Sequence, residues 1–186
     1  MTPVWIGLGA AAFVALLVIA SYNRFVRQRN LVEESWKQVD VELRRRYDLI
    51  PNLVETVKAY AAHERQTFEA VISARNAAVQ AAASRTAQGE DETQLTRSLR
   101  GLLAVAEAYP QLKADQHFLD LQTQLAETED RIAASRRFYN GNVRAYNTRV
   151  DAFPSSVIAG VFGFDKAEYF EIEEAAARAP RQVDFA

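Results

Sequence analysis

Residues 4 to 29 read VWIGLGAAAFVALLVIASYNRFVRQR, an uncharged apolar run followed at once by a flank that contains three arginines. The run stays uncharged through Tyr22 and is just long enough to cross roughly 30 Å of hydrocarbon as an α-helix. Trp5 and Tyr22 stand near its two ends, where aromatic rings settle at membrane–water interfaces. A cleaved signal peptide would need a basic stretch before the apolar run, and only the α-amine stands there. We therefore expect residues 1–22 to form a transmembrane helix.

The direction of this helix follows from its basic flank. Arg24, Arg27 and Arg29 come directly after the apolar run, and further basic residues recur at Lys37 and at positions 44–46. Lys and Arg close to a membrane span are retained in the cytoplasm. We expect a single-pass protein of the bacterial inner membrane, with its N-terminus outside and residues 23–153 in the cytoplasm. Each arginine near anionic head groups would contribute about 1 kcal/mol.

The composition restricts both fold and function. The 186 residues are rich in Ala, Glu, Gln, Arg and Leu and hold only seven Gly and five Pro, which indicates an all-α fold. A net charge of -2 provides no general attraction for nucleic acid. Because the chain has no cysteine, it has no disulfide, no thiolate zinc site and no thiol nucleophile.

The apolar pattern predicts that the first helix continues from the membrane into the soluble body. Nothing breaks the chain between Pro3 and Pro51, and an apolar stripe with alternating spacings of four and three covers its soluble part, interrupted only by Arg46. The stripe consists of Val32, Trp36, Val39, Leu43 and Ile50. Pro51 disfavours helical geometry at Ile50 and suits a first helical turn, so the chain is predicted to turn back there.

Three further helices are predicted after Pro51. The second runs to about residue 85, with Glu64 and Arg75 at positions where apolar residues are expected. Residues 83–93, which include Gly89, are predicted to be an exposed and mobile loop. The third helix covers residues 92–109, and Pro110 ends it. The fourth carries the longest stripe in the chain: Phe118, Leu121, Leu125, Ile132, Tyr139, Val143, Tyr146, Val150 and Phe153.

These elements predict an antiparallel bundle of four long helices over residues 23–153. Residues 154–170 contain the apolar stretch VIAGVFGF, which is too short to span a bilayer, and residues 171–186 are expected to be a short helix with a loose tail. Three positions are open to the strip: a cap on the bundle, insertion at the membrane interface, or contact with a neighbouring subunit. The strip consists of Phe153, Val157, Ile158, Val161, Phe162 and Phe164.

A search for chemistry finds no catalytic, cofactor-binding or metal-binding motif. His63 and His117 lack the Glu-x-x-His spacing of a di-iron bundle, and Thr67 stands where a zinc protease helix would need its second histidine. Pairs such as those in residues 127–131 are expected to be helix-surface ion pairs. A set of hydrogen-bonding residues could fix helix register or a subunit contact if buried: Tyr47, Asp48, Asn52, Tyr139, Asn140, Tyr146 and Asn147.

Several of these stretches together resemble the bacterial LemA family. The resemblance rests on residues 22–64 and on LLAVAEAYPQLKADQHFL, ETEDRIAASRRFYN, AYNTRVDAFPSSVIAGVFGF and a terminal VDF. It implies an antiparallel helical bundle behind an N-out membrane helix. It supplies no established biochemical activity. Some relatives are associated with building bacterial membrane organelles, and by analogy the resemblance implies a membrane-organising or scaffolding role here.

The hypothesis favoured by the sequence is a membrane-anchored scaffold without catalytic activity that self-associates into a homo-oligomer and organises membrane or other membrane proteins. Its expected partners are the lipid bilayer and copies of itself, with no nucleic acid and no small-molecule substrate. The alternatives are a metal-binding or enzymatic bundle and a receptor-like adaptor for a membrane protein or protease.

Overall fold

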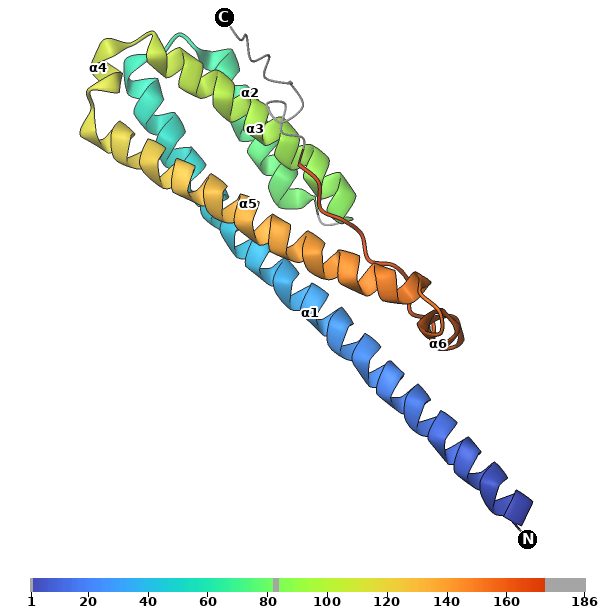
Figure 1. Cartoon of the computed structure of the whole chain (residues 1–186). Helices are drawn as coiled ribbons and strands as arrows, with labels where there is room; N and C mark the ends of the chain where they lie inside the picture. The colour runs from blue at the N-terminus through green and yellow to red at the C-terminus, as the bar shows by residue number, and fades with distance from the viewer. Residues whose placement is uncertain (1, 82–83, 173–186) are drawn as a thin grey trace, which may run out of the picture. The chain divides into compact units, whose positions relative to one another are not determined.

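The computed structural model describes residues 2–81 and 84–172, and every regular element in that part of the chain is an α-helix (Figure 1). The helices are α1 (Thr2–Tyr60), α2 (Arg65–Gln80), α3 (Arg85–Glu107), α4 (Pro110–Lys113), α5 (Gln116–Asp151) and α6 (Ser155–Phe162). The all-α fold class and the uninterrupted first helix are both confirmed.

The chain divides into two compact units. One unit comprises residues 1–40 and 134–168, and the other comprises residues 41–133 and 169–186. Because α1 and α5 are long, each of them contributes its two halves to different units.

In the first unit, the N-terminal part of α1 packs against the C-terminal part of α5. The Trp36 and Tyr139 rings lie 5.2 Å apart between centroids, and those of Phe25 and Tyr146 lie 6.2 Å apart. Since residue numbers rise along α1 as they fall along α5, the two segments are antiparallel. Toward its N-terminus α1 is long and apolar enough to cross a membrane, and its side chains from Trp5 to Leu17 are all exposed.

In the second unit, the C-terminal part of α1 packs against α2 and against the N-terminal part of α5. The Tyr60 hydroxyl donates to Asp115 at 3.0 Å, and the Arg46 guanidinium contacts Glu129 at 2.7 Å, so α1 and α5 are antiparallel here too. The core consists of the stripe residues that periodicity predicts, including Leu43, Ile50 and Leu125. The seam of this unit is therefore the predicted one.

The predicted turn at Pro51 is wrong, because α1 continues through this proline to Tyr60. A proline inside a helix leaves the carbonyl four residues earlier without its usual donor. Here that carbonyl belongs to Tyr47, and Arg75 of α2 donates its Nε–H to it at 3.0 Å. The chain reverses instead at residues 61–64, and α2 ends at Gln80, earlier than predicted.

The predicted loop over residues 83–93 is also wrong, because α3 begins at Arg85. Ser84 is extended and its hydroxyl accepts the Ala87 N–H at 3.1 Å, which caps the helix. Gly89, Glu92 and Thr93 are buried, so the small and charged residues that indicated a loop are packing residues.

The fourth predicted helix is confirmed as α5, which carries the longest stripe. Its positions from Phe118 to Tyr146 are buried, whereas Phe153 lies beyond the helix and is 84% exposed. Residues 164–172 form an extended segment, here called the strap, and Phe170 in it is fully buried. The short helix expected near the C-terminus is absent from residues 168–172, and residues 173–186 lie outside the described part.

Candidate membrane-interface site

An aromatic cluster stands where the apolar run of α1 ends. Phe25 is fully buried and stacks on Phe164 with centroids 4.7 Å apart and an interplanar angle of 13°. Tyr22 contacts the rings of Phe162 at 5.0 Å and Phe164 at 5.5 Å. Offset and edge-on contacts of this kind stabilise a cluster by about 0.5–1.5 kcal/mol per pair beyond the burial of area. The cluster therefore fixes the end of α6 against the last turns of the apolar run.

Two arginines lie over the faces of this cluster. The Arg29 guanidinium is 5.7 Å from the Phe164 centroid, and that of Arg149 is 5.8 Å from the Phe25 centroid, both within cation–π range. Burial lowers the pKa of Arg149, and the nearby positive charge of Arg24 lowers it further. Burial also raises the pKa of Tyr146, which Arg29 opposes. The cluster is thus an apolar body with a positively charged edge.

Helix α6 leaves the cluster through a glycine turn. Gly163 has φ 67° and ψ 42°, the left-handed conformation that glycine adopts without a steric cost. The Phe164 N–H then donates to the Ala159 carbonyl at 2.9 Å, which completes a C-terminal cap. This turn returns Phe164 to the cluster while α6 projects away from it.

The other face of α6 is exposed. Ala159 is buried and Ile158 is half-buried, whereas Val157 is 57% and Val161 is 73% exposed. These two valines are four residues apart, so they lie on one face of the helix. Phe162 is also exposed. The apolar strip is therefore divided: Ala159 and Phe164 pack inside the unit, and most of the larger side chains do not.

The strap is held against α5 by side chains that the sequence singled out. Asn147 is buried, and its side chain both donates to the Ala167 carbonyl and accepts the Ala167 N–H, each at 2.9 Å. The Tyr139 hydroxyl donates to the Glu168 carbonyl at 2.7 Å. Lys166 pairs with Asp151 at 2.8 Å. The partners of Asn147 and Tyr139 are backbone atoms of an irregular segment, and helical periodicity could not predict these contacts.

The remaining residues of the predicted polar set are dispersed. Tyr146 belongs to the aromatic cluster, Asn140 is half-buried, and Tyr47 is buried in the second unit. Asp48 and Asn52 are exposed. Arg24, Arg27 and Arg29 are all exposed on α1. The sequence reasoning missed Phe25 and Arg149, although Phe25 stands one heptad before Val32 and this spacing could have identified it.

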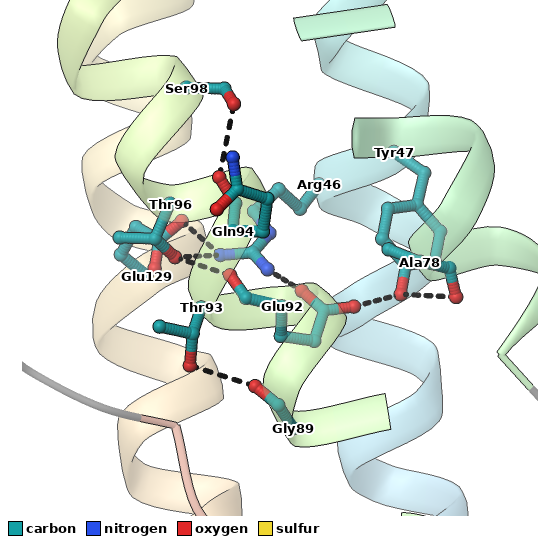
Figure 2. A network of polar contacts seen from close by, with 10 residues as sticks. All are labelled: Arg46, Tyr47, Ala78, Gly89, Glu92, Thr93, Gln94, Thr96, Ser98 and Glu129. Atoms are coloured by element: carbon teal, nitrogen blue, oxygen red, sulfur yellow. Dashed lines mark hydrogen bonds and ion pairs between the residues drawn. The ribbon is translucent and has the colours of Figure 1, made fainter. Parts of the chain in front are cut away.

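A buried polar network joins three helices in the second unit (Figure 2). Arg46 and Glu92 are both fully buried and form an ion pair between α1 and α3. Arg46 also contacts Glu129 of α5 at 2.7 Å and Thr96 at 3.3 Å, while the Tyr47 hydroxyl donates to Glu92. Charges taken out of water in this way require partners. The network ties α1, α3 and α5 together through side chains at one level of the second unit.

No arrangement in the described residues points to catalysis. Across residues 2–81 and 84–172, no three or more acidic or histidine side chains form a group suited to a metal ion. His63 and His117 are exposed. An open groove of about 790 Å³ lies between α1 and α2 over Val54, Phe68 and Ile72 and is edged by Lys58, Arg65 and glutamates, without a histidine.

Comparison with known proteins identifies the family of the chain. The family model described as LemA family matches residues 35–185. Two proteins of Paramagnetospirillum magneticum named Magnetosome protein MamQ are 28% identical over 88% of this chain and 69% of their own length. Protein LemA of Metamycoplasma hominis is 24% identical over 82% of this chain and 69% of its own length. Neither name states a catalytic activity. With most of its length matched and an apolar helix near its N-terminus, the chain belongs to the LemA family of membrane-associated proteins.

Proposed function

We propose that the chain is a single-pass anchored scaffold of the bacterial inner membrane that self-assembles and has no catalytic activity. Its N-terminus would lie outside the cell and its helical body in the cytoplasm. The observation that carries the proposal is the apolar, exposed stretch of α1 from Trp5 to Leu17 that continues without a break into the helical body. So much apolar surface on one helix requires a hydrocarbon environment.

The organising role is supported by the similarity to proteins named for the magnetosome. It is also supported by the kind of packing found in the described part of the chain, which consists of long helices joined by a buried polar network.

The anchor is tested by replacing Val14 and Leu16 with arginine. An arginine at the centre of a membrane helix costs about 2.5–3.5 kcal/mol, so two should prevent stable insertion. Leu31→Arg is the matched control, because Leu31 is exposed on the same helix beyond the apolar run. After alkaline carbonate washing, the wild-type chain and Leu31→Arg should stay in the membrane pellet, and the double variant should not. A wild-type chain released by carbonate would contradict the anchor.

Assembly is tested with the full chain in mild detergent and in liposomes. Light scattering should give a protein mass that is a multiple of 20.9 kDa, and cryo-electron tomography should show arrays or altered membrane curvature. A single-chain mass together with undisturbed vesicles would refute the scaffold role.

A further inference from the structure

The exposed face of α6 adds apolar side chains to the surface of the first unit, beyond the apolar run of α1. Val157 and Val161 of α6 are 57% and 73% exposed, and Phe153, which precedes the helix, is 84% exposed. Their exposure to water is unfavourable, because full burial of an apolar side chain of this size contributes about 1.5–3 kcal/mol of free energy. Something other than the described part of this chain is therefore expected to cover them.

The position of α6 along α1 indicates what that cover is. Tyr22, the last residue of the uncharged run, contacts Phe162 at the end of α6. Figure 1 shows α6 beyond the end of α5 and beside α1. If the apolar run crosses the bilayer, Tyr22 lies at the membrane–water interface and α6 lies at the same depth. The lipid-facing surface of α1 and the exposed face of α6 then adjoin each other.

The charges around α6 match a membrane surface. Arg24 and Arg27 are exposed on α1, and Arg149 lies close enough to Arg24 for their charges to interact. Within residues 2–81 and 84–172, none of these three arginines forms an ion pair with a carboxylate. Head-group phosphates carry the complementary charge, and they would be within reach of side chains at this level.

The orientation of α6 is fixed on its C-terminal side. The Gly163 turn and the buried Phe164 hold its C-terminal end, and the Asn147 clasp on Ala167 holds the strap that follows. These contacts hold α6 with Val157 and Val161 exposed.

We propose that α6 is an interfacial membrane helix whose side chains Val157 and Val161, together with Phe153 just before the helix, enter the head-group region of the leaflet from which α1 emerges, with Arg24, Arg27 and Arg149 on lipid phosphates. The inference rests on the proposed function, because it requires that α1 crosses the same bilayer. It adds a second membrane contact to the transmembrane one. Lipid is favoured over a second copy of the chain because the face continues the lipid-facing surface of α1.

Site-directed spin labelling of the full chain in liposomes tests this directly. Because the chain has no cysteine, single Cys variants can be labelled without altering a native thiol. We would label Val157→Cys, Val161→Cys, Leu16→Cys inside the apolar run, and Phe138→Cys on an exposed site of α5. Power saturation with oxygen and with a water-soluble nickel chelate reports the depth of each label.

Labels at positions 157 and 161 should be more accessible to oxygen than to nickel, as a label in lipid is, and the label at 138 should show the reverse. If position 16 is in lipid but 157 and 161 are in water, the interfacial helix is refuted and the anchor stands. Labels at 157 and 161 shielded from both reagents would also refute it, in favour of a protein cover, and spin–spin broadening lost on dilution with unlabelled chain would identify a second copy. If position 16 is itself outside lipid, the proposed function fails as well.

The phosphate contacts have a separate readout. In phosphatidylglycerol vesicles the labels at 157 and 161 should lie deeper than in phosphatidylcholine vesicles, because anionic head groups attract the arginines. Combining Arg24→Gln with Arg27→Gln should reduce that difference at least twofold. Glutamine replacements on exposed Arg97 and Arg100 of α3 should leave it unchanged. An equal depth in both lipids would overturn the phosphate contacts.

Discussion

Arg46 shows how a single side chain can set the packing of a seam. The sequence presents it only as an interruption of the apolar stripe, whereas the structure buries it completely against Glu92 of α3. A buried ion pair contributes little net stability compared with apolar residues of the same volume, but removal of one partner leaves a charge without compensation. Arg46 therefore specifies which residues of α1, α3 and α5 face one another.

We predict that Glu92→Ala lowers the free energy of unfolding by about 3–5 kcal/mol, because Arg46 keeps its charge without its closest partner. Arg46→Met combined with Glu92→Leu should recover most of that loss. Arg45→Ala is the control, since Arg45 makes only an exposed 4.0 Å contact with Glu42 and should cost less than about 1 kcal/mol. Denaturant unfolding in detergent, followed by circular dichroism, measures all three. A small loss for Glu92→Ala would show that the pair does not hold the seam.

Gly89 and Gly101 provide a matched pair within α3. A Cβ at Gly89 would collide with the backbone carbonyl of Glu171, while a Cβ at Gly101 would meet nothing within 4 Å. Gly89→Ala should therefore destabilise by about 1–3 kcal/mol through overpacking. Gly101→Ala should stabilise by roughly 0.5–1 kcal/mol, because alanine loses less backbone entropy in a helix. Thermal unfolding of the two variants should shift in opposite directions, and shifts of the same sign would contradict the close approach.

At the scale of whole helices, periodicity predicted the buried faces of the long helices. It did not predict helix ends that depend on contacts with residues far away in the sequence. The stripes of α1 and α5 are regular, so their buried faces are the predicted ones. The prediction of a turn at Pro51 was wrong because Arg75, a residue on another helix, donates to the Tyr47 carbonyl that the proline leaves without a donor. The prediction of a loop over residues 83–93 was wrong because a charged residue such as Glu92 is expected on the surface. In the structure Glu92 is buried, and its ion pair with Arg46 compensates its charge. The strap was not predictable, because irregular backbone has no period.

The passage of α1 through Pro51 makes a specific prediction about coupling. Arg75→Leu should cost about 1–3 kcal/mol, because the Tyr47 carbonyl then lacks a donor. In a Pro51→Ala background the alanine N–H can bond that carbonyl, so the same Arg75→Leu change should cost clearly less. A double-mutant cycle on unfolding free energies measures the difference. Equal costs in the two backgrounds would show that Arg75 does not replace the missing helical hydrogen bond.

For the whole molecule, the charge next to the apolar run should determine the direction of insertion. Replacing Arg24, Arg27 and Arg29 with glutamine, together with Thr2→Lys and Pro3→Lys, should invert a measurable fraction of chains, because positive residues are retained in the cytoplasm. A fluorescent protein and alkaline phosphatase, each fused after Ala186, report the two orientations. Gln replacements at Arg97, Arg100 and Arg137 are the distant control and should change nothing. Phosphatase activity from the unaltered chain would reverse the proposed topology.

The clasp between Asn147 and Ala167 has a practical consequence for anyone preparing a shortened polypeptide. Deleting residues 1–22 removes the stretch that demands hydrocarbon, but it leaves α6 tied in place with its valines and Phe153 facing outward. Such a fragment is expected to stay poorly soluble in plain buffer and to need a little detergent or added lipid. Replacing Val157 and Val161 with aspartate should increase the solubility of this fragment in plain buffer.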